Sequence, residues 1–260
     1  MTILDNIVEN KKKELKHLME LTSVRDLEKS SLFNRKTISL SESLSDNTKT
    51  GIIAEFKRKS PSKGVINSFS LVEEVISGYI REGASGLSVL TDNRFFGGSA
   101  TDLLCARENS IIPILRKDFI IDEYQVVESK SIGADTILLI AAILEEKTIV
   151  RLARSARLLG LEVILEIHEQ DELDKVNSYI NIIGVNNRNL KTFEINTDVS
   201  ERLSEKIPHG YLKISESGIS SPLVIEKLRE SGYNGFLIGE NFMKEPDPVK
   251  AFSGFVKSLK

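Results

Sequence analysis

Eight short runs rich in Val, Ile and Leu follow one another through the chain after residue 50, and each is followed by room for a helix. The runs are Ile52–Lys57, Gly86–Leu90, Ile112–Arg116, Thr136–Ile140, Glu162–Ile167, Ile182–Asn186, Leu212–Ser215 and Gly235–Gly239. Alternating buried strands and amphipathic helices are typical of parallel strands joined by helical crossovers. Eight such units in about 210 residues predict a TIM (β/α)8 barrel formed by residues 49–260.

Residues 1–48 lie outside this rhythm. Ile3, Leu4 and Ile7 have the spacing of an apolar helix face, so we expect an N-terminal helical extension packed on the barrel. The polar segment 39–50 at its end predicts a loop.

Two helix starts are indicated by capping-box pairs. Ser70 with Glu73, and Asp122 with Gln125, have the spacing in which two side chains satisfy backbone N–H groups at a helix N-terminus. We expect helices to begin just after Ser70 and Asp122.

The charge balance excludes a nucleic-acid footprint. The formal net charge is -3, and the basic run 11–13 is answered by Glu9, Glu14 and Glu20, which predicts a solvated helix face. No uncharged apolar run is long enough to cross a bilayer, and no signal-peptide core is present. We therefore expect no nucleic-acid or membrane partner.

The number of cysteines indicates the redox state of the cellular compartment. The single cysteine, Cys105, excludes an intramolecular disulfide and any site built from several cysteines. This fits a reducing environment, so we expect a cytoplasmic protein. We also expect a monomer, with weak homo-oligomers as the alternative.

Charged residues stand at the ends of several predicted strands. Alternate strand residues share a face, so Ile53, Glu55 and Lys57 point the same way. Burying isolated charge is costly, so Glu55 and Lys57 should lie at the strand end, where water or a charged ligand reaches them.

A second acid and base come from the third and fifth strands. Lys117 and Glu166 share parity with inward-facing apolar neighbours and should meet Glu55, Lys57 and Asn186 at one rim of the barrel. A lysine and a glutamate in a dry pocket can act as acid and base, although a structural ion pair is the alternative.

The ends of the last two strands suggest an anion site. Ser217, Gly218, Gly239 and Glu240 follow strands seven and eight, where this fold often binds phosphate with backbone N–H groups, and Ser60 could add a side-chain contact. The alternative is that Gly218 only turns the chain and Gly239 only packs.

Aromatic residues and histidine complete the candidates. Phe95, Phe96 and Phe119 could form an apolar wall for an aromatic group, or belong to a satellite core. We interpret His168 as a loop hydrogen-bonding residue. A metal site is not expected, because a lysine beside each carboxylate would repel a cation.

Five blocks at strand ends match one enzyme family in register. They are IAEFKRKSPS (53–62), PILRKDFI (113–120), ADTILLI (134–140), NNRNL (186–190) and ESGI (216–219). Together they resemble the indole-3-glycerol-phosphate synthases of tryptophan biosynthesis, with a likeness that runs from about residue 3 to 258.

This resemblance implies an activity and a first set of roles. The family closes the ring of 1-(2-carboxyphenylamino)-1-deoxyribulose 5-phosphate, losing CO2 and water, without a cofactor. Lys117 then corresponds to the general acid and Glu166 to the base. Lys57 corresponds to the ligand of the substrate carboxylate and to a second acid as well, and Glu55 and Asn186 correspond to orienting groups.

The resemblance also implies binding residues. Ser217 joins the catalytic set, and the substrate-binding positions are Ser60, Phe96, Phe119, Arg188, Glu216, Gly218, Gly239 and Glu240. A carboxylate next to phosphate is repulsive, so we expect the Glu240 side chain to turn away and only its N–H to face the ligand.

Two other functions compete with this one. Phosphoribosylanthranilate isomerase and similar barrels use a Cys/Asp or Asp/Asp pair, whereas the strand ends here carry Lys and Glu. A non-catalytic barrel that binds a phosphate ligand would not need Glu55, Lys57, Lys117 and Glu166 together.

Overall fold

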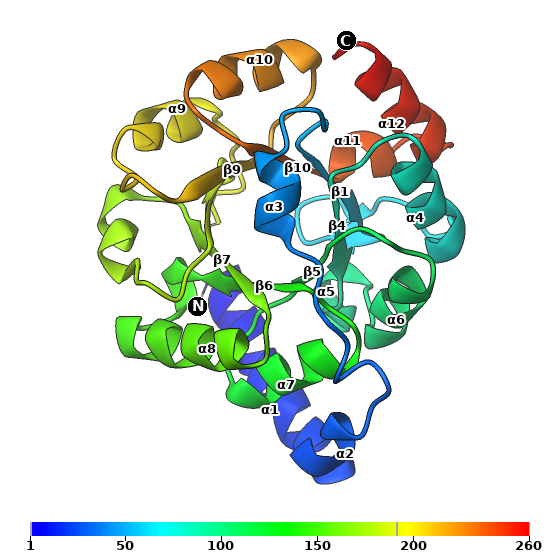
Figure 1. The fold of residues 1–260 in the computed structure, drawn as a ribbon, viewed down its shortest axis with the longest axis vertical. Helices are drawn as coiled ribbons and strands as arrows, with labels where there is room; N and C mark the ends of the chain where they lie inside the picture. The colour runs from blue at the N-terminus through cyan, green and yellow to red at the C-terminus, as the bar shows by residue number, and fades with distance from the viewer. Residues whose placement is uncertain (1, 191, 260) are drawn as a thin grey trace.

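A closed barrel of eight parallel strands forms the centre of the molecule (Figure 1), as the computed structural model of residues 2–190 and 192–259 shows. The order around the barrel is β1-β10-β9-β8-β7-β6-β5-β4. The strands are β1 (Ile52–Phe56), β4 (Gly86–Leu90), β5 (Ile114–Lys117), β6 (Thr136–Ile140), β7 (Glu162–Ile167), β8 (Ile182–Asn186), β9 (Leu212–Glu216) and β10 (Gly235–Ile238). The TIM (β/α)8 barrel is confirmed, with each strand close to its predicted run.

Helices surround the barrel and join successive strands (Figure 1). They are α4 (Val72–Arg81), α5 (Asn93–Phe96), α6 (Ala100–Glu108), α7 (Glu123–Ser131), α8 (Glu146–Leu158), α9 (Asp198–Ser204), α10 (Pro222–Glu230), α11 (Glu240–Met243) and α12 (Pro248–Lys257). The 3-10 helices η1 (Ala141–Ile143) and η2 (Gln170–Lys175) add single turns, and β2 (Lys59–Ser60) pairs with β3 (Gly64–Val65) after β1. The connection from β7 to β8 thus carries only η2.

One of the two predicted helix caps is confirmed. Asp122 and Gln125 form the capping box of α7. The prediction for Ser70 is wrong: α4 begins at Val72, with Leu71 as N-cap residue. The N–H of Ser70 instead bonds Oδ1 of Asn67 at 3.0 Å, which ends the preceding turn.

Alternate strand residues divide between two apolar regions. Ile53, Leu115 and Ile164 pack inside the barrel, whereas Ile52 and Ala54 face the surrounding helices. This alternation confirms the predicted parity. It also places the polar residues at the strand ends on the inner face.

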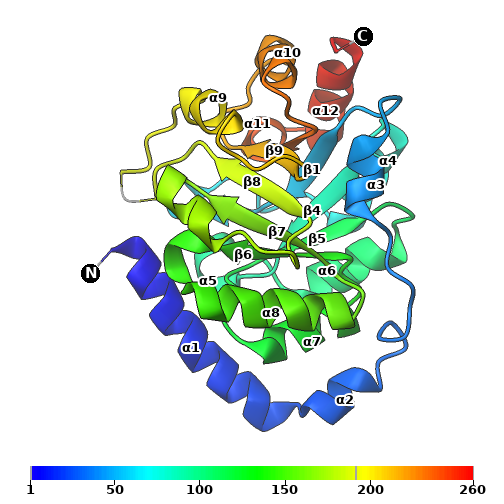
Figure 2. The ribbon, with the colours of Figure 1, turned by 60° about the vertical axis from the view of Figure 1, so that its left-hand side comes forward.

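The N-terminal segment forms three helices, α1 (Ile3–Leu21), α2 (Val24–Glu28) and α3 (Leu40–Ser45). Figure 2 shows α1 lying along the outside of the barrel and α3 at its N-terminal end. The helical extension is therefore observed for the described residues from 2 onward, while the domain boundary at 48 stays a prediction.

The predicted loop over 39–50 is wrong in its first half, which forms α3. Leu40 and Leu44 of this helix are buried against the first residues of β4 and β10, Gly86 and Gly235, where a Cβ atom would collide with them. Glu162 holds the start of α3 by accepting the N–H groups of Leu40 and Ser41, at 2.9 Å each, and the hydroxyl of Ser39. The helix closes the barrel at this end.

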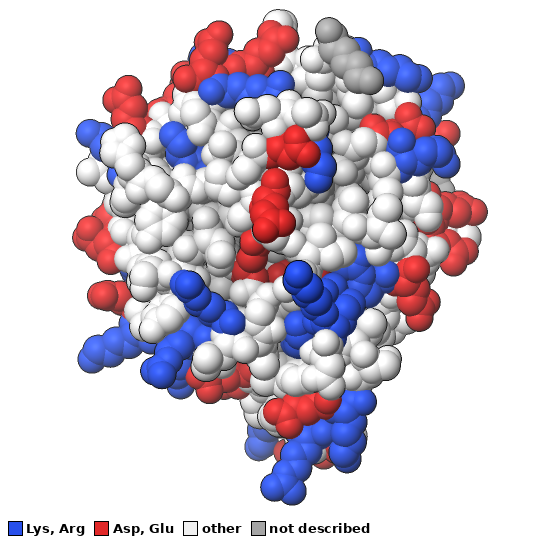
Figure 3. Space-filling view, viewed as in Figure 1, with Lys and Arg blue, Asp and Glu red and all other residues white. Residues whose placement is uncertain are grey.

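The surface around α3 carries both signs of charge. Figure 3 shows Lys and Arg side chains interspersed with Asp and Glu side chains around this face. Within residues 2–190 and 192–259, no helix is both long and apolar enough for a membrane crossing.

Candidate active site

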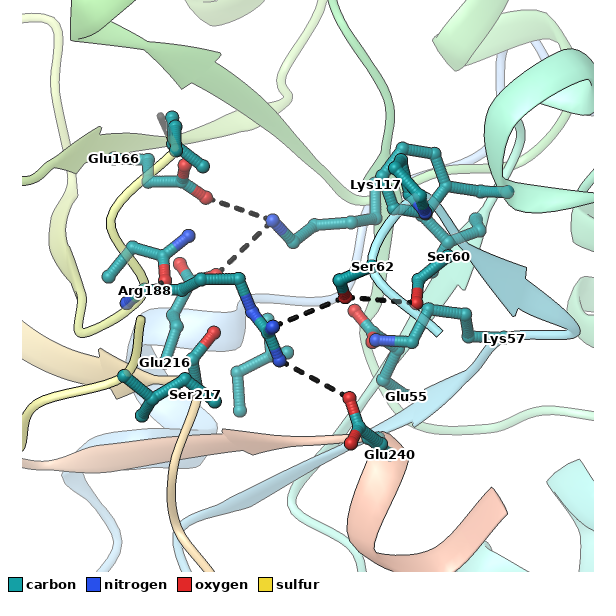
Figure 4. Close-up of a pocket in the computed structure, with 18 of the residues that line it drawn as sticks. Glu55, Lys57, Ser60, Ser62, Lys117, Glu166, Arg188, Glu216, Ser217 and Glu240 are labelled. Carbon is teal, nitrogen blue, oxygen red and sulfur yellow. Dashed lines mark hydrogen bonds and ion pairs between the residues drawn. The ribbon is translucent and has the colours of Figure 1, made fainter. Parts of the chain in front are cut away.

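A cavity of about 330 Å³ opens at the C-terminal ends of the barrel strands (Figure 4). Of the site residues predicted from the sequence, all except Phe95 line it: Glu55, Lys57, Ser60, Phe96, Lys117, Phe119, Glu166, Asn186, Arg188, Glu216, Ser217, Gly218, Gly239 and Glu240. They come from the ends of β1, β5, β7, β8 and β9 and from the loops after β1, β4, β5, β8, β9 and β10, as the fold requires.

Lys117 is the central charge of the cavity. Figure 4 shows its side chain reaching across toward two carboxylates, and its Nζ lies 2.9 Å from Glu166 Oε2 and 3.2 Å from Glu216 Oε2. Burial opposes the ammonium, but Glu166, Glu216 and Glu55 outweigh it and raise the pKa of Lys117. The lysine therefore carries a proton to donate.

The two carboxylates beside Lys117 differ. Burial alone would raise the pKa of Glu166, but Lys117 and His168 outweigh it and lower that pKa, which keeps Glu166 ionised. Burial raises the pKa of Glu216 to about 7, and the charge of Glu166 adds to this against the opposing effect of Lys117. Glu216 Oε1 is buried without a hydrogen-bond partner among the described residues.

The opening pair, Glu55 and Lys57, forms an ion pair of 2.7 Å at the end of β1. Glu55 is buried and Lys57 Nζ is partly exposed to the cavity. Gly239 passes so close that a Cβ atom there would collide with the Glu55 carboxylate. The packing role for Gly239 is thus observed, and its amide still borders the cavity.

The turn after β9 has an unusual backbone. Ser217 has φ 67°, a left-handed conformation that costs energy for a residue with a side chain, and Gly218 follows with φ 79°. Asn187 Nδ2 donates to the carbonyl oxygen of Ser217 at 3.0 Å and holds the turn. The strained turn keeps the Ser217 and Gly218 backbone at the cavity wall.

Arg188 joins three loops at the rim. It donates to Ser62 Oγ and to Glu240 Oε2, both at 3.2 Å (Figure 4). The Glu240 carboxylate points toward Arg188 at the rim, so its turning away from a bound phosphate stays a prediction. Arg188 offsets the negative charge of Glu240.

The apolar wall is only partly as expected. Phe96 and Phe119 pack with ring centroids 5.9 Å apart and line the cavity, whereas Phe95 belongs to the inner apolar cluster and is not among the lining residues. The described residues hold no cluster of His, Cys, Asp and Glu suited to a metal ion.

Comparison with known proteins assigns the family. The family model described as indole-3-glycerol phosphate synthase matches residues 4–255. The chain belongs to the indole-3-glycerol phosphate synthase family. It is 46% identical to the indole-3-glycerol phosphate synthase of Bacteroides thetaiotaomicron over 257 residues, which cover 99% of this chain and 98% of the relative. The Polaromonas sp. synthase is 40% identical, with coverage of 96% and 97%.

A solved structure of another protein shares the fold. Tryptophan synthase subunit alpha from Legionella pneumophila matches with a TM-score of 0.62 over 85% of this chain and 95% of that chain, at 15% identity. At this identity the likeness concerns the barrel architecture alone.

Part of the cavity wall comes from helix α1, a contribution that the sequence did not predict. Ile3, Leu4 and Ile7 of α1 line the cavity next to the Phe96 and Phe119 wall. Their helical spacing was evident, but nothing in it indicated that this face would reach the site.

The prediction that Lys11 is solvated is wrong. The basic run 11–13 was predicted to be solvated, and Lys12 and Lys13 are exposed, but Lys11 is 2% exposed. Its Nζ lies 3.0 Å from Asp118 Oδ1, next to Lys117, and 3.2 Å from Asp92 Oδ2, before α5. The ion pairs fasten α1 to two loops of the site.

Proposed function

We propose that this chain cyclises 1-(2-carboxyphenylamino)-1-deoxyribulose 5-phosphate to indole-3-glycerol phosphate with release of CO2 and water. Family membership supports an enzyme that carries out a decarboxylating ring closure on a small molecule. By reaction class this is a carbon–carbon lyase. The observation that supports the roles of individual residues is the protonated Lys117 in contact with the ionised Glu166 inside one cavity.

Lys117 is the general acid of this proposal. When the aromatic ring carbon attacks the keto carbon, negative charge develops on the keto oxygen, and a proton from Lys117 Nζ neutralises it. A buried ammonium held by two carboxylates is pre-organised for this step and does not need to reorient. CO2 then leaves from the same ring carbon, and the ring keeps the electron pair and regains aromatic character.

Glu166 is the general base in the later dehydration. The new hydroxyl group takes a proton from Lys57, in its acid role, and leaves as water, and removal of a proton from the closed ring completes the indole. Glu166 accepts that proton because its low pKa leaves it ionised at neutral pH. Ser217, on the strained turn, lies at the same wall, where its hydroxyl and backbone can hold the substrate.

The remaining lining residues bind different parts of the substrate. Lys57 is placed to pair with the substrate carboxylate, with Glu55 orienting the lysine. The aromatic ring fits against Phe96 and Phe119. Backbone N–H groups of Gly218 and Glu240, with Ser60, are proposed to hold the phosphate, while Asn186, Arg188 and Glu216 orient the groups around it: Asn186 Oδ1 accepts the N–H of Arg188 at 3.0 Å.

Production of indole-3-glycerol phosphate tests the function. The purified chain is mixed with the carboxyphenylamino substrate, indole fluorescence is followed, and the product is identified by mass. We expect product from the wild type and a large loss in Lys117→Ala. Absence of product with the wild type, or undiminished turnover in the variant, would contradict the proposal.

The isomerase alternative has less support. Its acid–base pair contains Asp with Cys or Asp, whereas no cysteine is among the described lining residues and the one aspartate there, Asp118, is paired with Lys11 and Arg116. Incubation with phosphoribosylanthranilate is the matching control, and we expect no conversion. A cytoplasmic location, a monomeric state and the lack of a nucleic-acid partner stay predictions. Light scattering after gel filtration tests the monomeric state.

A further inference from the structure

His168 lies just beyond the end of β7, two residues after Glu166, with 11% of its side chain exposed. Its Nε2 is 3.5 Å from Glu166 Oε1, and its Nδ1 is 3.7 Å from Glu172 Oε2. Both ring nitrogens are buried and have no hydrogen-bond partner among residues 2–190 and 192–259. The imidazole therefore lies between two carboxylates, of which one is the proposed base.

Glu172 is held firmly in its position. Its Oε2 accepts the backbone N–H of His168 at 2.5 Å and that of Glu169 at 3.2 Å, and Glu172 completes the capping box at the start of η2. The sequence-based interpretation of His168 is thus half right: its backbone bonds within the loop. Its ring faces charge on both sides.

The groups facing His168 favour its protonated form. Burial lowers the pKa of an imidazole, but the nearby Glu172 carboxylate on η2, the charge of Glu166 on β7 and that of Glu216 on β9 outweigh burial and raise the pKa of His168. The cation nearest to this cluster, Lys117 on β5, is itself paired with Glu166 and Glu216.

We propose that His168 is a positioning residue that keeps Glu166 ionised and orients its carboxylate. Lys117 lies next to Oε2 of Glu166, and His168 lies next to its other oxygen, Oε1. The two cations fix the plane of the carboxylate, while the longer 3.5 Å contact leaves Oε1 able to approach a substrate proton. This inference depends on the proposed role of Glu166 as base.

The ion pair itself is tested without any substrate. NMR titration of the His168 ring is expected to place its pKa above the ordinary histidine value of about 6.5. Because coupling between two sites is reciprocal, Glu166→Gln should lower the His168 pKa. A His168 that titrates at or below the ordinary value, or is unmoved by Glu166→Gln, would overturn the proposal even if the enzyme makes its product.

The pH profile of turnover tests the effect on the base. His168→Asn removes the nearby positive charge, so the pKa of Glu166 rises and the acid limb of kcat should move to higher pH by about one unit. On the acid limb, below the pKa of Glu166, kcat should then fall by up to about tenfold, with KM little changed and no loss at neutral pH. Glu172→Gln should shift the limb in the same direction by less.

A matched control separates this effect from folding. His209 is exposed and far along the chain, and His209→Asn should leave the profile unchanged. A loss of kcat in His168→Asn that is equal at every pH, or no loss at all, would contradict the positioning role. Wild type without product would refute the proposed function instead, and the NMR titration would still decide whether the ion pair exists.

Discussion

At the N-terminal end of the barrel, Asp135 is buried with all of its partners in place. Its Oδ1 accepts Arg35 Nη2 at 2.7 Å and the N–H of Ile38 at 2.8 Å, while its Oδ2 accepts Arg107 Nη1 at 2.6 Å and the N–H of Ile114 at 2.9 Å. Glu162 is satisfied in a similar way by the start of α3.

At the C-terminal end, buried charge is left partly unsatisfied. Lys117 is shared between two carboxylates, Glu216 keeps one oxygen unpaired among the described residues, and both nitrogens of His168 lie beyond hydrogen-bonding distance of their carboxylates. Buried polar groups without partners destabilise a fold. Arg35 Nε, Ser41 Oγ and Thr136 Oγ1 near the N-terminal end also lack a hydrogen bond among the described residues, but at the C-terminal end the incompletely paired groups are carboxylates and an imidazole at the cavity, which indicates groups held ready for a ligand. The comparison teaches that one end stabilises the barrel while the other is set up for chemistry.

Of the variants that test this difference between the two ends, the one without Lys117 should show the largest effect. We expect Lys117→Met to lower kcat by roughly 10³-fold, because the acid for the keto oxygen is lost. The melting temperature should also fall, because Glu166 and Glu216 lose their shared cation, although uptake of protons by these carboxylates limits the loss. Steady-state indole fluorescence and thermal unfolding measure both. A variant that keeps more than a tenth of its turnover would weaken the comparison.

Breaking the opposite end should act on stability. Asp135→Asn leaves the buried guanidinium group of Arg107 and the half-buried one of Arg35 without their carboxylate, and we expect it to lower the free energy of unfolding by about 4 kcal/mol. Urea unfolding measures this, with the exposed Asp171→Asn as control. A loss below about 1 kcal/mol would show that this network is not a main support of the fold.

Lys11 connects the two roles. Lys11→Met should lower the free energy of unfolding by about 3 kcal/mol. This is less than the effect of Asp135→Asn, because Asp118 retains Arg116 and Thr91 as partners. Since α1 also lines the cavity, KM should rise. Lys12→Met, on the exposed side of the same helix, is the matched control, and equal effects from the two variants would contradict the account.

Glu216→Gln should give a smaller gain in stability that depends on pH. The pKa of Glu216 is raised to about 7 from 4.5, so the stability of its neutral form is complete below pH 4.5 and is lost as the pH rises through 7. The amide stays neutral, so the variant should be more stable than wild type by about 2 kcal/mol at pH 8 and equal to it near pH 4.5. Urea unfolding at both values checks this, and a variant less stable at pH 8 would show that Glu216 is ionised and well paired.

Much of the fold was predictable because its signals are local. Each barrel strand is a short apolar run, and alternation along it correctly placed Glu55, Lys117 and Glu166 on the inner face. The site residues were found because a parallel barrel gathers all its strand ends at one face. Their chemical roles stay proposals.

The missed features depend on partners distant in the chain. Helix α3 is short and polar, and its start is held by Glu162, more than a hundred residues away. Lys11 can be buried because Asp92 and Asp118 both form ion pairs with it. Neither partnership has a local pattern, so only the folded structure could show it.

Turnover per folded molecule, compared between Lys117→Met and Asp135→Asn, tests the central claim most directly. Indole fluorescence gives the rate, and circular dichroism at the same temperature gives the folded fraction. We expect Lys117→Met to stay folded and lose roughly 10³-fold in turnover, while folded Asp135→Asn keeps turnover within about twofold of wild type. Equal losses per folded molecule in the two variants would contradict the division between the two ends of the barrel.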